Sequence, residues 1–172
     1  LEAALYERNF EKEKRAVSCI TMLHAYLLVQ SGIPVLYSGD EIGQLNDYTY
    51  KEDPYKWADS RYLHRGKFRW DKLEETDKDY EVSMTIFNAL LKMEEIREKY
   101  QVFNWKADVW TFDTGYRHVL GIGRYYEKEE IRAYFNFSEY ELDEVWMPMD
   151  QGKDFMNLLD GKTMEETGNH LG

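Results

Sequence analysis

The chain has 172 residues, a formal net charge of −11 and an aromatic share of 16%. Nucleic acids and anionic membrane surfaces require a basic patch, so this acidity argues against both, whereas a neutral partner such as a sugar remains compatible. The length allows one hydrophobic core, or one small domain with part of another. The single cysteine, Cys19, excludes an internal disulfide, and its place on an apolar helix face predicts a small buried side chain.

The first periodic segment predicts a helix over about residues 11–30. Its apolar side chains recur at helical spacing at Ala16, Val17, Ile20, Leu23, Leu27 and Leu28. Gly32 and Pro34 end this helix, because both residue types interrupt helical geometry. The apolar run inside it is too short to span a membrane.

The helix leads into residues 32–43, which read GIPVLYSGDEIG. Val35–Ser38 is a short unbroken apolar run and predicts a strand buried on both faces, as in a parallel sheet. Gly39-Asp40-Glu41 then leaves the carboxyl end of this strand, where α/β proteins bind their ligands. We therefore interpret the stretch as one αβ step of an α/β protein.

Residues 40 to about 79 have no sustained periodicity but are rich in aromatic side chains: Tyr48, Tyr50, Tyr55, Trp57, Tyr62, Phe68 and Trp70. Structureless segments of this length are usually functional or disordered. The aromatic content argues against disorder. An ordered loop that covers a site is the better interpretation.

A second helix is predicted over roughly 80–100, with Asp79 as its capping residue and with one apolar face at Val82, Ile86, Leu90 and Met93. The pattern then changes to short strands, at 109–112, 118–122, 131–137, 144–147 and 154–159. Turn residues separate them at 113–115, 127–130, 150–152 and 160–161. The sequence thus predicts a separate antiparallel β module, with a boundary near 100–105.

Several chemistries are not supported by the motifs present. No spacing typical of metal ligands is found among the histidines, which are His24, His64, His118 and His170. A nucleotide-binding glycine loop and a serine-nucleophile elbow are also absent from the sequence, so we expect neither a metal nor a cofactor.

Two polar clusters remain as candidates for a binding site. Asp40 and Glu41 are adjacent and should point to opposite sides of the chain, so at most one faces a site while the other holds loop backbone. Asp59-Ser-Arg61 offers a guanidinium fork that binds carboxylates or sugar hydroxyls. The alternative for Arg61 is a loop salt bridge with Asp59.

These motifs resemble those of a known family. Residues 32–43 are similar to the eighth-strand motif of glycoside hydrolase family 13, the α-amylase family. Leu45-Asn-Asp47, followed by Asp59-Ser-Arg61 and His64-Arg65, resembles amylosucrase and related sucrose-cleaving members. Asn136-Phe-Ser-Glu139 resembles the C-terminal domain of the same group.

The resemblance implies a (β/α)8 TIM barrel followed by an antiparallel, sandwich-like β domain. Residues 1–100 would be the incomplete C-terminal end of that catalytic barrel, its last αβα segment, and residues 101–172 the β domain. The family's closing aromatic strand has no counterpart at the end of this chain, which would leave an unpaired sheet edge. The missing barrel strands would expose the helix flanks, so we expect association, or partial disorder around residues 40–79.

The resemblance also implies a retaining mechanism with an Asp nucleophile, a Glu acid/base and a stabilising Asp. All three follow barrel strands that precede this chain, so we expect no catalytic residue here and no activity in isolation. Arg61 matches the family's substrate-binding Arg, which closes the pocket on the glucosyl ring by pairing with an Asp outside this chain. Arg61 should then be exposed and unpaired, while Asp40, Glu41, Asn46 and Asp47 lie at the rim or support the loop.

The leading hypothesis is therefore the C-terminal part of an enzyme acting on an α-glucoside, most readily sucrose, that passes glucose to water, phosphate or a growing glucan. Its expected partners are the α-glucoside and the rest of the barrel, with no nucleic acid and no membrane. Alternatives are a family hydrolase or isomerase for maltose or trehalose, a non-catalytic carbohydrate-binding β module, and a purely structural accessory domain. The single cysteine and the absence of a visible signal sequence favour the cytoplasm, although Leu1 suggests a start inside a longer protein.

Overall fold

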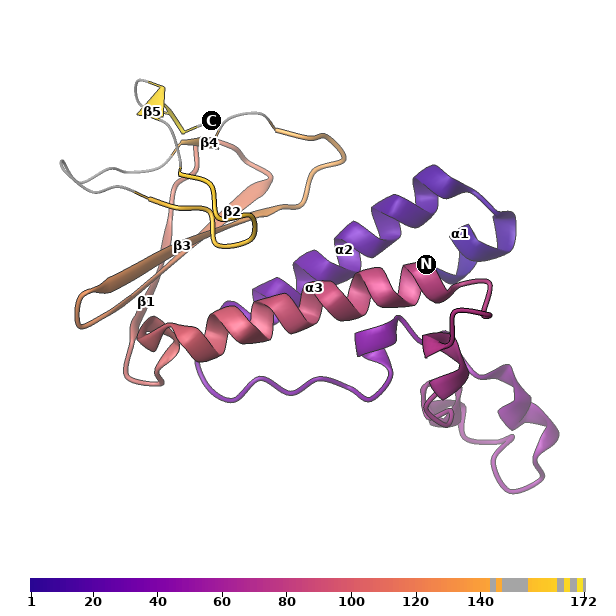
Figure 1. Cartoon of the computed structure of the whole chain (residues 1–172). Helices are drawn as coiled ribbons and strands as arrows, with labels where there is room; N and C mark the ends of the chain where they lie inside the picture. Colours follow the sequence, from indigo (N-terminus) through magenta and orange to yellow (C-terminus); the bar gives the residue numbers. More distant parts are fainter. Residues whose placement is uncertain (143–144, 147–154, 164–165, 168–169, 172) are drawn as a thin grey trace. The chain divides into compact units, whose positions relative to one another are not determined.

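The computed structural model describes residues 1–142, 145–146, 155–163, 166–167 and 170–171. The chain, which Figure 1 shows coloured along its sequence, divides by its contacts into two compact units. Unit 1 comprises Leu1–His24 and Val35–Leu91, and unit 2 comprises Ala25–Pro34 and Lys92–Gly172. Two long helices, α2 (Phe10–Val29) and α3 (Tyr80–Lys99), each contribute to both units. They confirm the two predicted helices to within a residue at each end.

Unit 1 contains the short helix α1 (Glu2–Glu7) and four 3-10 turns between the long helices. The turns are η1 (Asp40–Ile42), η2 (Tyr48–Glu52), η3 (Ser60–His64) and η4 (Trp70–Leu73). Aspartates begin two of them, because the carboxylates of Asp47 and Asp59 accept hydrogen bonds from the backbone two residues later, at 2.9 and 3.0 Å. The segment 40–79 thus contains a succession of short 3-10 turns, two of which are capped by an aspartate, in agreement with the interpretation of an ordered loop.

The buried side chains of unit 1 include Ala4, Ile42, Ile86 and Leu90. Gly43 allows the turn η1 to approach this core closely. Its φ of 61° favours glycine, and a Cβ at this position would lie only 2.5 Å from Ile86 Cδ1. The glycine that ends the GIPVLYSGDEIG stretch is therefore required by conformation and by packing.

The predicted strand over residues 35–38 is not formed. This segment has no strand partner within the described residues, and Val35 and Tyr37 are 76% and 51% exposed. The prediction of a strand buried on both faces is therefore wrong for this structure. A parallel strand needs hydrogen-bonded neighbours on its edges and helices on its faces, and the described part of the chain supplies no such neighbours.

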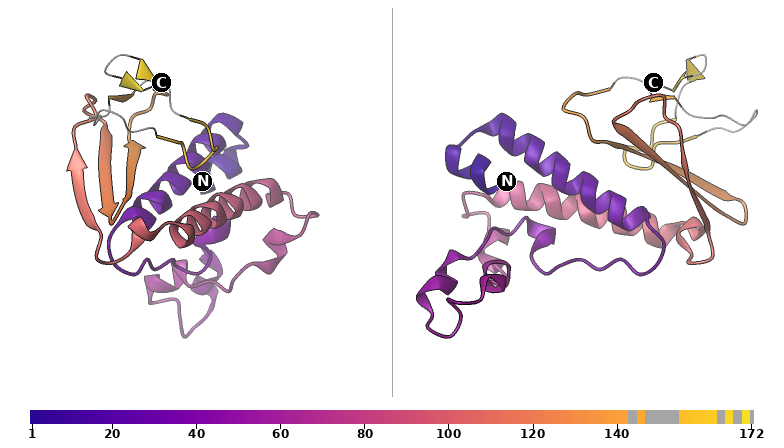
Figure 2. Two further views of the ribbon diagram at one scale, coloured as in Figure 1. Left: turned by 60° about the vertical axis from the view of Figure 1, so that its left-hand side comes forward. Right: turned by 180° about the vertical axis from the view of Figure 1, so that it is seen from behind.

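Unit 2 contains the turn η5 (Gln101–Phe103) and an antiparallel sheet of three strands in the order β1-β2-β3. The strands are β1 (Asp108–Phe112), β2 (Val119–Tyr126) and β3 (Glu129–Asn136), and they lie side by side in Figure 2. Gly121 and Gly123 of β2 lie opposite Phe112 and Trp110, whose rings fill the space that a Cβ would need. The predicted change from helical to antiparallel β structure is confirmed.

A second, smaller sheet has the order β4-β6-β5, with β4 (Val145–Trp146), β5 (Glu166–Thr167) and β6 (His170–Leu171). The predicted strand at 144–147 is present as β4. The predicted strand at 154–159 is reduced to a single bridge, Met156 to Thr163, and the turn predicted at 160–161 is formed with Gly161 at φ 78°. The turn predicted at 150–152 lies outside the described residues.

Two arginines bind the backbone carbonyls at the end of α2 in unit 2. Arg124 is fully buried and donates to the carbonyl oxygens of Val102, Val29 and Asn104, at 2.9, 2.8 and 3.1 Å. Arg97 donates to the carbonyls of Leu28 and Gly32. The last carbonyls of a helix lack partners inside the helix, so these guanidinium groups satisfy acceptors that would otherwise be buried unpaired.

Two further expectations concern α2. Cys19 is exposed, so the prediction of a buried thiol is wrong. The apolar face of α2 is only partly covered, because Leu23 of the same face is also exposed. In the part of the chain that the structure describes, no helix is both long enough and apolar enough to cross a membrane.

Candidate functional site

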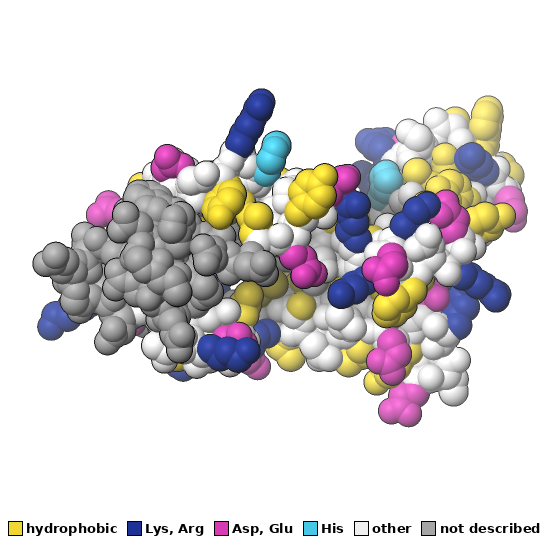
Figure 3. Space-filling view, turned by 90° about the horizontal axis from the view of Figure 1, so that it is seen from above, with side chains coloured by type: hydrophobic (Ala, Val, Ile, Leu, Met, Phe, Trp, Pro, Cys, Tyr) yellow, Lys and Arg dark blue, Asp and Glu magenta, His cyan; other side chains and the backbone are white. Residues whose placement is uncertain are grey.

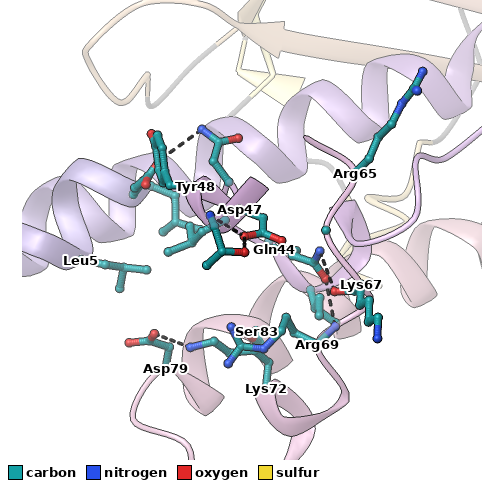
Figure 4. Close-up of a pocket in the computed structure, with 18 of the residues that line it drawn as sticks. Leu5, Gln44, Asp47, Tyr48, Arg65, Lys67, Arg69, Lys72, Asp79 and Ser83 are labelled. Atoms are coloured by element: carbon teal, nitrogen blue, oxygen red, sulfur yellow. Dashed lines mark hydrogen bonds and ion pairs between the residues drawn. The ribbon is translucent and has the colours of Figure 1, made fainter. Parts of the chain in front are cut away.

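Unit 1 contains a cavity of about 950 Å³, which we name the unit 1 cavity (Figure 4). Its walls come from α1, from the loop that follows Ile42, from residues 62–69 and from the start of α3. Most of the lining side chains are polar or aromatic and include Gln44, Asn46, Asp47, Tyr48, Tyr50, Tyr62, Arg65, Arg69, Lys72, Asp77 and Asp79. The volume is in the range of small-molecule sites in proteins.

Gln44 joins the two loops that form the rim of the unit 1 cavity. Its amide nitrogen donates to the carbonyl of Lys67 at 3.2 Å, and its amide oxygen accepts from the backbone N–H of Arg69 at 3.0 Å (Figure 4). The backbone N–H of Asp47 donates to the carbonyl of Leu63 at 2.8 Å. These bonds hold residues 63–69 beside residues 44–47, although the two segments are about twenty residues apart in the sequence.

Asn46 and Asp47 line the cavity and also make hydrogen bonds within its loops. Asn46 donates to Glu2 at 3.2 Å and accepts from His64 Nδ1 at 2.9 Å. Asp47 accepts from the side chain and the backbone of Thr49, and these two bonds lower the pKa of its carboxyl. Both side chains therefore fix the loop on which the cavity depends.

A partly buried charge cluster of Lys72, Asp77 and Asp79 lies against the same cavity. Lys72 Nζ is 3.0 Å from Asp77 and 2.6 Å from Asp79, and all three side chains are less than one-fifth exposed. Burial acts to lower the pKa of Lys72, but its hydrogen bonds to Asp79 and Asp77 outweigh that effect and raise it. Burial acts to raise the pKa of Asp77, but bonds from the Asp79 backbone and from Lys72 bring it below its usual value.

Asp40 and Glu41 do not line the unit 1 cavity. Glu41 accepts a hydrogen bond from the backbone N–H of Gly39 at 2.7 Å and so closes the turn η1 on itself. Asp40 lies 3.7 Å from His24 Nε2 on α2. Glu41 thus holds loop backbone, as the argument from adjacent residues allowed.

Arg61 is exposed but is not unpaired. Its Nε and Nη2 atoms donate to the carboxylate of Asp59 at 2.7–3.0 Å, while 71% of its side chain remains exposed. The expectation of an unpaired guanidinium is therefore wrong, because a carboxylate two residues away satisfies it. The bonds from Arg61 lower the pKa of Asp59 to about 2. Arg61 is not among the residues that line the cavity.

Many of the charged side chains at the unit 1 cavity form ion pairs with neighbouring side chains of opposite charge. Lys56 pairs with Asp53 at 2.9 Å, Arg69 pairs with Asp71 at 2.5 Å, and Lys72 pairs with its two aspartates. On the face shown in Figure 3, basic side chains likewise lie beside acidic ones rather than in a separate basic patch. Such a surface offers many hydrogen-bond donors and acceptors without a strong field, which suits a neutral polyhydroxyl ligand.

Gln44 and the cluster of Lys72, Asp77 and Asp79 were missed by the sequence reasoning. The only signal for the cluster was the Asp-x-Asp spacing before the second helix, and Gln44 carried no signal because its partners are backbone groups. Among the described residues, no group of three or more His, Cys, Asp or Glu side chains is arranged to hold a metal ion. No known protein-family model matches the chain.

Proposed function

We propose that this chain is the C-terminal part of a family 13 glycoside hydrolase or glucosyltransferase that acts on an α-glucoside, with sucrose as the substrate. The catalytic carboxylates would lie in the barrel strands that precede these residues in the intact enzyme. This chain would contribute the last αβα segment of the barrel, a loop at the sugar site and the C-terminal β domain. The isolated chain is inactive in this proposal.

The observation that carries the proposal is the unit 1 cavity beside the GIPVLYSGDEIG stretch. The stretch ends in the turn η1, and the loop that follows it supplies Gln44, Asn46 and Asp47 to a polar cavity with aromatic walls. Carboxylates, amides and tyrosines are the groups that hydrogen-bond and stack against sugars. A cavity of this composition, directly after the resembling motif, supports a carbohydrate site.

The order of the elements and the exposed segment after α2 also support the proposal. A long helix, an extended segment, a loop and a second long helix come before an antiparallel sheet, which is the order that the family resemblance implies. The side chains of Val35 and Tyr37 are exposed, although the sequence pattern around them is typical of a buried strand. Neighbouring barrel strands in the intact enzyme would cover them.

Arg61 is proposed to bind the donor glucosyl group in the intact enzyme. Its present partner, Asp59, shares the same exposed turn, and an exposed ion pair of this kind is weak enough to exchange for another carboxylate. The family resemblance assigns that second carboxylate to an early barrel loop. Asp59 would then hold the guanidinium in position until the barrel loop is present.

The test is the release of fructose from sucrose, measured on residues 1–172 and on the full-length protein side by side. The proposal expects release by the full-length protein and none by residues 1–172. Release by residues 1–172 alone would place catalytic carboxylates within this chain and overturn the proposal. If neither sample releases fructose, sucrose is excluded, and maltose and trehalose become the substrates to assay.

A further inference from the structure

The position of Gln44 in unit 1 is fixed by the turn that precedes it. Its backbone N–H donates to the carbonyl of Gly39 at 2.8 Å and so closes this turn. Gly39 has a φ of 102°, which favours glycine, and a Cβ added there would lie 2.9 Å from the Cβ of Gln44. A larger residue at position 39 would therefore displace the Gln44 side chain.

A second glycine, Gly66, lies close to the same side chain. A Cβ added to Gly66 would lie 3.0 Å from the Cβ of Asp47 and 3.5 Å from Nε2 of Gln44. Because Gly66 has no side chain, the backbone around it can approach the loop of residues 44–47 closely. The close contact between these two segments therefore depends on a glycine at this position.

The amide of Gln44 uses both of its polar atoms on one backbone segment. Its Nε2 donates to the carbonyl of Lys67 at 3.2 Å, and its Oε1 accepts from the backbone N–H of Arg69 at 3.0 Å (Figure 4). A primary amide carries a donor and an acceptor side by side, whereas an ionised carboxylate only accepts and an aliphatic side chain does neither. Glutamine is thus suited to hold this segment at two points.

The segment that Gln44 holds follows directly after the turn η3, which carries Arg61. The end of η3 is fastened to the same loop, because the backbone N–H of Asp47 donates to the carbonyl of Leu63 at 2.8 Å. Contacts at residues 63–69 therefore link the turn that carries Arg61 to the loop of residues 44–47.

We propose that Gln44 is a positioning residue, whose two bonds to the backbone of residues 67–69 set the position of η3 and thereby of Arg61. The inference rests on the proposed function, in which Arg61 binds the donor glucosyl group. The ion pair of Arg61 with Asp59 lies within one turn, so it does not place the guanidinium relative to the loop of residues 44–47. Gln44 supplies that placement and acts on the substrate through Arg61.

Hydrogen exchange on residues 1–172 tests the positioning without any substrate. Gln44→Met keeps the length of the side chain and removes both bonds, and Gln101→Met makes the same change at an exposed glutamine of unit 2. In Gln44→Met the backbone N–H groups of Arg69 and Asp47 should exchange at least about tenfold faster, while Gln101→Met should match the wild type.

Unchanged exchange at the N–H of Arg69 in Gln44→Met would overturn the proposal. So would faster exchange at Arg69 with unchanged exchange at Asp47, because Gln44 would then hold residues 67–69 without holding η3. Unchanged exchange within α3 establishes that the variant folds. Gln44→Glu keeps the shape of the side chain but loses the donor to Lys67, and it replaces Gln44→Met in the same measurement if that variant unfolds.

The second experiment is a double-mutant cycle on kcat/KM for sucrose in the full-length protein. Gln44→Met should lower kcat/KM about tenfold in the wild-type background and less than about twofold in the Arg61→Ala background. Equal losses in the two backgrounds would overturn the proposal, because Gln44 would then act without Arg61. If the full-length protein does not cleave sucrose, the proposed function fails, and the exchange measurement alone decides whether Gln44 positions η3.

Discussion

Two cavities among the described residues, one in each unit, are similar in volume and different in chemistry. The unit 1 cavity is lined by amides, carboxylates and cations, many of them paired with one another. The cavity of about 850 Å³ in unit 2, between the ends of α2 and α3 and the strand β3, is lined mostly by aliphatic and aromatic side chains. In unit 1 the polar groups also hold the loops together, through Gln44 and Asp47. In unit 2 the fold is held mainly by apolar packing and by two arginines bound to backbone carbonyls. Ligand selectivity should therefore differ between the units.

The largest expected effect is on the stability of unit 2. Arg124→Met removes three hydrogen bonds and leaves the carbonyls of Val29, Val102 and Asn104 without that partner. We expect a loss of about 3–5 kcal/mol in the free energy of unfolding. Urea titration followed by circular dichroism measures it, with the exposed Arg117→Met as the control. A loss below about 1 kcal/mol would show that water or other donors replace the guanidinium.

A smaller effect is expected at the turn that begins the unit 1 site. Gly43→Ala introduces both backbone strain at φ 61° and a clash with Ile86, whereas Gly32→Ala introduces strain at φ 96° with no atom within 4 Å of its Cβ. Gly43→Ala should therefore be the more destabilising of the two, by about 1–3 kcal/mol in the same titration. Equal losses would mean that the turn moves freely away from Ile86.

The cluster of Lys72, Asp77 and Asp79 should make the stability of unit 1 depend on pH. The pKa of Asp77 is lowered on folding from its ordinary value of 3.8. A carboxyl with a lowered pKa stabilises the fold above its unfolded pKa, and this contribution is lost as the pH falls through the folded pKa. Wild type should thus be more stable than Asp77→Asn near pH 6, and the difference should shrink below about pH 4. An unchanged difference across this range would contradict the role given to the Asp77–Lys72 pair.

The smallest expected effect concerns two buried hydroxyl groups of unit 2 that differ in their hydrogen bonding. Tyr134→Phe removes a hydroxyl that has no partner within the described residues, so the free energy of unfolding without ligand should change by less than about 0.5 kcal/mol. Thr114→Val is the matched contrast, because its buried hydroxyl donates to the carbonyl of Val119 at 2.9 Å. That variant should lose about 1–2 kcal/mol. Equal losses in the two variants would indicate that Tyr134 does have a partner.

Local patterns in the sequence predicted the elements of this fold well. Helical spacing located both long helices, and the change of period after Tyr100 located the antiparallel strands. These patterns are strong because they depend on residues close together in the chain. The prediction of a strand at 35–38 was wrong for the opposite reason. A parallel strand depends on neighbouring strands that are distant in the sequence or outside the described residues.

Side-chain partners were harder to predict than elements. The role of Asp47 as loop support followed from its residue type, because aspartate bonds to the backbone two residues on. The side chains of Gln44, Arg97 and Arg124 bind backbone carbonyls. Every residue has a backbone carbonyl, so the sequence does not indicate which residues these side chains contact. For Arg61 the sequence offered two alternatives, an unpaired substrate-binding guanidinium and a loop salt bridge with Asp59, and the structure has the salt bridge.

The most direct test of the central claim is the turnover of sucrose by the full-length protein carrying Arg61→Ala. Because Arg61 is proposed to bind the donor glucosyl group, this variant should lose at least about tenfold in kcat/KM, since a charged hydrogen-bond donor to the substrate is removed. Arg117→Ala in unit 2 should retain wild-type turnover. Wild-type turnover by Arg61→Ala, with normal stability, would contradict the proposed role of Arg61 in binding the donor sugar.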